Sequence, residues 1–312
     1  MVVSLPFRFN APQIFAMGID CPSRCKRAGL TPKFHRNGYY FRKDDRRYLR
    51  RWHCPSCRRS FSMTTGSDTF RMRKRGINER LLGMLASKVT MRRCAILLNV
   101  SRQTVARRFL FLAARAWSYV ESLAPRDLCQ IQFDEMRSSI HTKCKPVSIP
   151  VAVCPQSRMF LAFDVVSMPA QPPLHEKSLR KYGPLADDRD LGVANVLKRI
   201  STMTKPDCVI ETDMDPRYGP HIESHFPSAV HQAHRSSPAC ETGQGEMKRV
   251  GFDPLFAINH DLAMMRDGVS RLVRKTWATS KRLDRLSDHI AIYIWFHNTR
   301  LVVGARRHRV RQ

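Results

Sequence analysis

The sequence predicts a multidomain protein in which a small cysteine-containing domain and a helical domain precede a larger α/β domain with a mixed sheet. Three observations support this order: two cysteine pairs near the N-terminus, apolar residues at helical spacing after Asn78, and short apolar strands after Pro125. The chain has 312 residues, 43% of them hydrophobic, which is enough for more than one buried core. The expected domains are residues 1–66, 67–124 and 125–304, followed by a basic tail at 305–312.

The charge of the chain indicates a polyanionic partner. Its formal net charge is +28 at pH 7, and the excess is mostly arginine, whose planar guanidinium group matches phosphate. We therefore expect DNA or RNA as the partner. A ribosome-associated protein, or one that is merely basic, remains the alternative on charge alone.

Neither a membrane span nor an export signal is expected. No stretch approaches the roughly 18 to 20 consecutive apolar residues that cross a bilayer, and Met1–Asn10 lacks a signal-peptide pattern. We expect a soluble protein that stays inside the cell, in the cytoplasm. The ten cysteines then indicate metal ligation where they cluster and ordinary burial where they are isolated.

Two tight cysteine pairs predict a zinc ribbon. The pairs are Cys21 with Cys25 and Cys54 with Cys57, and four thiolates brought together make a tetrahedral Zn²⁺ site. The second pair is the stronger, because CPxC followed by a basic residue forms a compact turn around sulfur. Three residues separate the first pair, so we keep two reserve ligands and the alternative of reduced cysteines without metal. The reserve ligands are His35 and His53.

Arginines crowd the same segment, which predicts a metal-held surface that faces phosphate. They are Arg46, Arg47, Arg50, Arg51, Arg58 and Arg59.

The next segment has the spacing of a helix-turn-helix. Apolar residues recur at three-and-four spacing in two runs before Ser101, which is a natural N-cap for a third helix. Val105 and Phe109 are expected to face inward from this helix. The two runs contain Leu81, Leu82, Leu85 and Val89, and then Met91, Ala95, Leu97 and Leu98.

In that motif the second of two helices, here the helix that begins after Ser101, enters the major groove of DNA. Arg102, Gln103 and Thr104 would then approach base edges, and Arg107 and Arg108 would contact phosphates. The alternative is an ordinary helical hairpin with a charged, solvated face.

After Pro125 the pattern changes to strands. Three strands, a helix, a fourth strand and a further strand describe an RNase H-like sheet, in which the first and fourth strands lie side by side. The expected strands are Leu128–Met136, Pro146–Cys154, Arg158–Val166, Asp207–Glu211 and Ser228–His231, and the helix is Leu191–Ser201.

This arrangement would bring Asp134 and Asp213 together. Two carboxylates there can hold two divalent ions, Mg²⁺ or Mn²⁺, about 4 Å apart, for in-line phosphoryl displacement. Alternatively, either aspartate caps a strand or turn. Glu135, Asp164 and Asp215 are nearby substitutes for either one.

The chain resembles bacterial insertion-sequence transposases of the DDE type that carry an N-terminal zinc ribbon and helix-turn-helix. The resemblance covers nearly the full length, and rests on the CPxC and helix-turn-helix segments and on Phe133–Met136, Glu211–Tyr218 and Ile258–Thr276. It implies metal-dependent cleavage and strand transfer at insertion-sequence ends. Asp134 and Asp213 match the first two acids of the family.

The third family acid is replaced here. Its aligned position is Asn259, and Arg266 lies seven residues later on the same helical face, where the family has a basic residue. Some insertion-sequence transposases resemble this chain in carrying asparagine, whose neutral carbonyl oxygen would hold the second ion less tightly. Asp261, Glu241 and Glu246 are alternative sources of the missing acid.

Basic residues continue along and beyond this helix. Arg266, Arg271, Arg274 and Lys275 would clamp phosphates, although the later ones could equally form a solvated face. A final helix is expected to pack on the core, before a tail that either contacts phosphate or is a disordered solubilising end. The apolar residues of this final helix are Leu283, Leu286, Ile290, Ile292, Ile294 and Phe296.

The leading interpretation is a DNA transposase that acts on terminal inverted repeats and target DNA. Two DNA ends must be held together, which implies at least a homodimer in the active complex. Two alternatives remain: a catalytically inactive, transposase-derived DNA-binding regulator, and an RNase H-like nuclease outside transposition.

Overall fold

The computed structural model describes residue 21 and residues 33–235, 253–273 and 278–303. The chain divides into two compact units, Met1–Ile77 and Asn78–Gln312. The sequence placed boundaries at 66/67 and 124/125, whereas in the structure the helices that follow Ile77 belong to the same unit as the large sheet. The reason is tertiary packing within that unit, where the long helix α4 (Arg102–Ser122) lies against the late helix α9 (Leu283–Phe296).

The first unit contains a small antiparallel sheet of three strands in the order β1-β2-β3. The strands are β1 (His35–Arg42), β2 (Arg47–His53) and β3 (Ser60–Ser62). Their hydrophobic cluster is small: Cys21, Cys54 and Phe61 are buried, and Phe34, Trp52 and Cys57 pack around them. Among the described residues of this unit, few apolar side chains therefore form its core.

Three helices begin the second unit. They are α2 (Ile77–Leu85), α3 (Met91–Leu97) and α4. The predicted N-cap is confirmed, because the Ser101 hydroxyl accepts a hydrogen bond from the Thr104 backbone N–H at 3.1 Å. Val105 and Phe109 are buried as expected, whereas Leu97 is 62% exposed.

The second unit is built on a mixed sheet of six strands. Its order is β6-β5-β4-β8-β9, and β7 pairs with β5. β4, β5 and β6 are antiparallel neighbours, whereas β8 is parallel to both β4 and β9. The predicted strands are present, and the third is divided in two. The strands are β4 (Leu128–Ser139), β5 (Pro146–Cys154), β6 (Met159–Phe163), β7 (Val166–Ser167), β8 (Thr204–Asp213) and β9 (Val230–His234).

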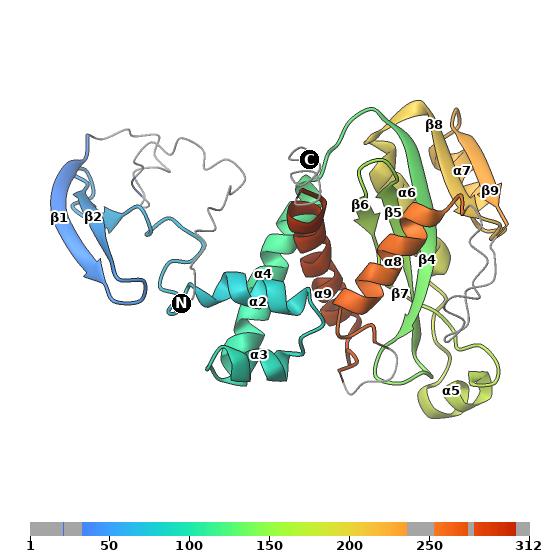
Figure 1. The fold of residues 1–312 in the computed structure, drawn as a ribbon, viewed down its shortest axis with the longest axis horizontal. Coiled ribbons are helices and arrows are strands. Elements are labelled where there is room, and N and C mark those ends of the chain that lie inside the picture. The colour runs from blue at the N-terminus through green and yellow to red at the C-terminus, as the bar shows by residue number, and fades with distance from the viewer. Residues whose placement is uncertain (1–20, 22–32, 236–252, 274–277, 304–312) are drawn as a thin grey trace, which may run out of the picture. The chain divides into compact units, whose positions relative to one another are not determined.

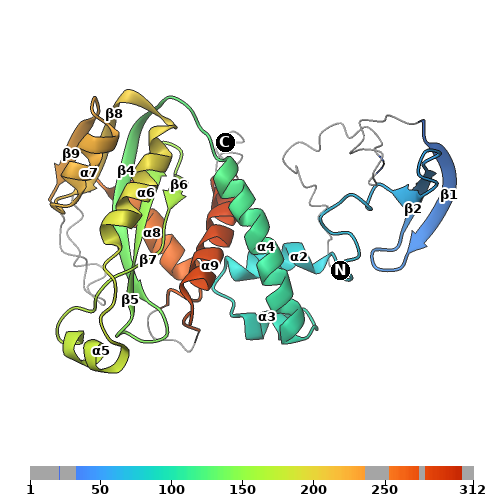
Figure 2. The same cartoon turned by 180° about the vertical axis from the view of Figure 1, so that it is seen from behind.

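Helices cover both faces of this sheet (Figures 1 and 2). On one face, α6 (Arg189–Ser201) and α7 (Tyr218–His225) share an apolar core with Ile131 and Phe133 of β4. On the other face lies α8 (Phe256–Gly268). Because side chains alternate along a strand, the residues of β4 between these core positions face α8.

Three further elements complete the described chain. The short helix α5 (His175–Tyr182) precedes α6, and α9 continues into a π-helical turn, His297–Leu301. Both α6 and α9 confirm helices that the sequence predicted. Among the described helices, none combines the length and apolar character needed to cross a membrane.

Candidate functional site

Asp134 and Asp213 lie on neighbouring parallel strands, on the same face of the sheet. Gln132 of β4 is paired with Glu211 of β8, and each aspartate follows its paired residue by two positions. Two residues is one full repeat of a strand, so both carboxylates share the face that carries Gln132 and Glu211. The structure thus brings together the two acids that the sequence singled out.

The two carboxylates influence each other electrostatically. Burial, followed by the negative charge of Asp213, raises the pKa of Asp134 to about 7. Burial also raises the pKa of Asp213, with further contributions from Asp215 and Glu135. Partly buried carboxylates with raised pKa values bind cations well, because a cation offsets both the lost hydration and the repulsion.

A network of side-chain amides fixes the start of α8 on the same face. The Gln132 Nε2 group donates to Glu211 Oε2 at 2.9 Å and to the Pro254 carbonyl at 2.8 Å, and its Oε1 accepts from the Ile258 N–H at 2.9 Å. Gln130 also donates to Glu211, at 2.9 Å. Gln132 therefore connects the aspartate-bearing strands to the first turn of α8.

Asn259, the predicted third ligand, directly follows Ile258 in this turn. Its side chain is exposed, and its amide donates to Asp253 Oδ2 at 2.9 Å. The contact that the structure gives Asn259 is therefore with Asp253, at the start of the same helix. Its assignment as a metal ligand stays a prediction.

The alternative third acid Asp261 has a different environment. It is 1% exposed and forms an ion pair with Arg158 at 2.7 Å. The His297 ring lies 3.9 Å from the same carboxylate. Asp261 is thus a buried partner of Arg158, and we no longer expect it to bind an ion with Asp134. The other two alternatives, Glu241 and Glu246, lie outside the described residues.

Arg217 holds two further acids that the sequence offered as substitutes for the pair. Its guanidinium group forms ion pairs with Glu135 and, at 2.7 Å, with Asp215. The Asp215 N–H in turn donates to Asp213 Oδ1 at 3.1 Å. Arg217 therefore fixes the turn after Asp213, a role that the sequence analysis missed because the Glu135 partner is 82 residues away.

The third substitute, Asp164, is also engaged elsewhere. Its carboxylate accepts from the Val165 N–H at 2.7 Å and from Asn195 Nδ2 at 2.9 Å. These contacts connect the end of β6 to α6. Of the described acids considered from sequence, Asp134 and Asp213 remain the pair on the same face of neighbouring strands.

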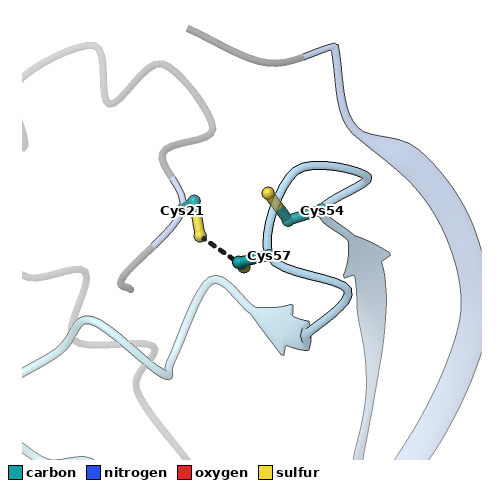
Figure 3. A group of neighbouring side chains, drawn as sticks. All are labelled: Cys21, Cys54 and Cys57. Atoms are coloured by element: carbon teal, nitrogen blue, oxygen red, sulfur yellow. Dashed lines mark hydrogen bonds between the residues drawn. The ribbon is translucent and has the colours of Figure 1, made fainter. Parts of the chain in front are cut away.

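Three of the four predicted zinc ligands lie close together (Figure 3). The ligand sulfurs of Cys21, Cys54 and Cys57 are all within 4.8 Å of one another, and the Cys21 and Cys57 sulfurs are 3.5 Å apart. Within the described part of the chain, these three cysteines are the group of potential ligand side chains that lie close enough together to hold a metal ion. Cys25 lies outside the described residues.

The reserve ligands lie in the strands beside this cluster. His35 and His53 are directly opposite each other in the β1–β2 pair. Neither belongs to the described group of metal-binding side chains. The soft thiolate donors of the cluster suit Zn²⁺, and Cys25 stays the predicted fourth ligand.

The predicted DNA-reading residues lie at the start of α4. Arg102, Gln103 and Arg107 are exposed, and Arg108 is partly buried. Thr104 is also partly buried, and its hydroxyl lies 3.0 Å from that of the capping Ser101. Exposed side chains at a helix start are available to a ligand, whereas Thr104 contributes to the cap.

Arg271 was expected to contact phosphate, but its contacts lie inside the second unit. Its guanidinium group donates to Ser280 Oγ at 3.0 Å and to the Arg285 carbonyl at 3.2 Å, and lies 4.9 Å from the Phe109 ring centroid. Burial lowers its pKa. We therefore no longer expect Arg271 to contact DNA. Arg266 on α8 is partly buried, and Arg274 and Lys275 lie outside the described residues.

Comparisons with protein-family models and with curated proteins find no match to this chain. The functional interpretation therefore depends on the residues and geometry described above.

Proposed function

We propose that this protein is a DNA transposase of the DDE type, with asparagine as the third residue. It would cleave DNA at the ends of an insertion sequence and join the freed 3′-hydroxyl to target DNA. Holding two ends requires at least two copies of the chain. The exposed arginines of α4 would bind terminal repeats, and a zinc ribbon completed by Cys25 would add contacts to phosphate.

The observation that carries this proposal is the Asp134–Asp213 pair. Two partly buried carboxylates with raised pKa values lie on adjacent parallel strands, and a helix N-terminus is fixed on the same face. The strand order β6-β5-β4-β8-β9 places β4 and β8, the strands expected to carry the two acids, side by side, which supports an RNase H-like sheet. These features support a site for phosphoryl transfer.

Each residue of the site would have a separate role in the reaction. Mg²⁺ or Mn²⁺ bound there would supply Lewis-acid activation of a water or 3′-hydroxyl and stabilisation of the leaving oxygen. Asp134 and Asp213 would supply negatively charged oxygen ligands, and Asp134 must lose its proton to do so. Gln132 would keep α8 and Asn259 in place, and Arg217 would keep Asp213 oriented through the Asp215 turn.

One observation favours a second candidate, a catalytically inactive DNA-binding regulator. The amide of Asn259 donates to Asp253, and asparagine lacks the charge of the family acid. Such a protein would bind DNA through α4 but would not cut it.

Cleavage of labelled DNA separates the two candidates. The substrate is a duplex that carries the inverted repeat flanking the gene, incubated with Mg²⁺ or Mn²⁺. We expect nicking at the repeat boundary, a loss of at least about 100-fold with Asp134→Asn or Asp213→Asn, and unchanged duplex binding. The matched control is Asp207→Asn, an exposed aspartate at the opposite end of β8, which should cut normally.

Either outcome is informative. Normal cleavage by Asp134→Asn would remove the assignment of the site. Specific binding by the wild type without cleavage in either metal would favour the regulator.

A further inference from the structure

One face of the small sheet in the first unit carries exposed aromatic rings. Phe41 is directly opposite Tyr48, and Tyr39 is directly opposite Arg50. Opposite residues and residues two apart share a face, so all four side chains project from the same side of the sheet. We call these four residues the aromatic face.

The rings of the aromatic face are unusually accessible. Tyr48 is 74% exposed, Tyr39 56% and Phe41 46%. By contrast, Tyr40 on the other side of the sheet is partly buried, and its hydroxyl lies 3.5 Å from that of Thr64. Single exposed apolar residues are common on proteins, but three adjacent rings on one face indicate a binding surface.

The rings lie close together, and the planes of Phe41 and Tyr48 are tilted by 50°. The centroids of Phe41 and Tyr48 are 5.1 Å apart. The Arg50 guanidinium carbon lies 4.9 Å from the centroid of Tyr39 and 5.8 Å from that of Trp52. The face therefore presents exposed aromatic rings beside a planar cation that donates a hydrogen bond to the Tyr39 hydroxyl, and proteins use rings and arginines of this kind to bind unstacked bases.

The charge around the aromatic face points to a nucleic acid. Residues 33–62 contain ten lysines and arginines but two aspartates. Exposed arginines flank the rings, among them Arg46, Arg47 and Arg51. The positive charge of these side chains attracts the phosphate backbone, and the bases can then stack on the rings. In a duplex the base faces are covered by their neighbours, so this stacking requires a single strand.

We propose that the aromatic face binds unpaired bases of single-stranded DNA. The choice of DNA over RNA rests on the proposed function, whereas the aromatic face itself does not depend on the carboxylate pair. The proposal also assigns the first unit a second mode of DNA binding, through bases instead of phosphates alone. In a reaction that opens DNA ends, such a face would hold the separated strand.

The test uses the full chain, with zinc retained, and a fluorescent thymine oligonucleotide in an anisotropy assay. We expect Tyr48→Leu to weaken binding at least about fivefold and Tyr39→Leu combined with Tyr48→Leu to weaken it further. Tyr48→Phe keeps the ring and should restore wild-type binding. The matched control is Phe70→Leu, because Phe70 is 44% exposed and has Arg71 over its ring at 5.5 Å, but lies outside the sheet.

Three further oligonucleotides identify the ligand. An abasic oligonucleotide keeps the phosphates but not the bases, so it should bind the wild type weakly and be insensitive to Tyr48→Leu. A duplex should bind the wild type and Tyr48→Leu alike, and a uridine oligonucleotide of the same length should bind the wild type less tightly than thymine does. Tighter binding of the RNA would assign the face to RNA and overturn the proposal.

Other outcomes would also overturn it. Equal binding of the thymine and abasic oligonucleotides would show that phosphate contacts suffice. If Tyr48→Leu altered the oligomeric state but not the affinity, the face would be a contact between copies. Since none of these assays measures cleavage, a failed Asp134 experiment would leave the result intact.

Discussion

The two compact units of this protein are stabilised in different ways. In the first, the described apolar cluster contains Cys21, Cys54 and Phe61 with a few partly buried neighbours. In the second, the sheet, α6 and α7 share a much larger core that includes Ile131 and Phe133. The comparison teaches that the described core of the first unit is small enough for a metal to add substantially to its stability, whereas the larger core of the second unit can tolerate buried carboxylates.

The largest expected effect is on the first unit. Cys54→Ser removes a buried sulfur atom from the cysteine cluster, and the zinc site that we propose there would contribute roughly 10 kcal/mol to folding of a small domain. Under the proposed zinc assignment, we expect the variant to fail to bind zinc and the first unit to unfold. Metal analysis and limited proteolysis measure the two effects.

The control for this change is another cysteine. Cys129 is exposed and lies on β4, so Cys129→Ser should keep both the zinc and the fold. Unchanged protease resistance in Cys54→Ser would contradict the idea that metal holds the small unit together.

A smaller effect is expected from the core of the second unit. Leu197 on α6 is fully buried against the sheet, so Leu197→Ala leaves a cavity that costs about 3 kcal/mol. Urea unfolding, followed by the helical circular dichroism signal, should show an earlier transition of the second unit. The zinc content of the Leu197→Ala variant without urea should equal that of the wild type. A lower zinc content would mean that destabilising the second unit also destabilises the first. Leu191→Ala, an exposed leucine on the same helix, is the control.

The smallest expected effect is a gain in stability. The pKa of Asp134 is about 7 in the folded protein, against 3.8 for an ordinary aspartate. The folded state therefore holds this proton more tightly than the unfolded state. The resulting penalty is absent below pH 3.8, grows as the pH rises from 3.8 to about 7, and is complete above that.

Asp134→Asn should accordingly stabilise the protein at pH 8, by a few kcal/mol at most, when Mg²⁺ and Mn²⁺ are absent. Near pH 4 the same substitution should change the free energy of unfolding little. Urea titrations at both pH values measure the difference, with Asp207→Asn as the exposed control. A gain of equal size at both pH values would contradict a raised pKa as its cause.

Much of the secondary structure could be predicted because its signals are local. The strands of the large sheet follow runs of apolar residues, and α4 begins where Ser101 can cap it. The domain boundaries could not be predicted in the same way. The helical segment joins the large sheet through the packing of α4 against α9, about 170 residues later in the chain, as in the 3.1 Å hydrogen bond from Trp117 to Asp288.

The candidate site shows the same division. Asp134 and Asp213 could be selected from sequence, because an acid at an apolar strand is costly without a partner. The roles of Gln132 and Arg217 could not, since their partners Ile258 and Glu135 come from distant segments. Arg271 illustrates the converse, because a basic residue near a helix end gives no sign that Phe109 and Ser280 surround it.

The sequence by itself therefore determined many of the strands and helices, the cysteine pairs, the positive charge and the two candidate acids, all of which are carried by residue type and short-range spacing. Only the tertiary structure decided which acids share a face, which are neutralised by Arg158 or Arg217, and which aromatic rings stay exposed on the small sheet. These outcomes depend on contacts between residues far apart in the chain. The alternation of side chains along a strand predicts which residues share a face of the sheet, but not which other elements pack against that face.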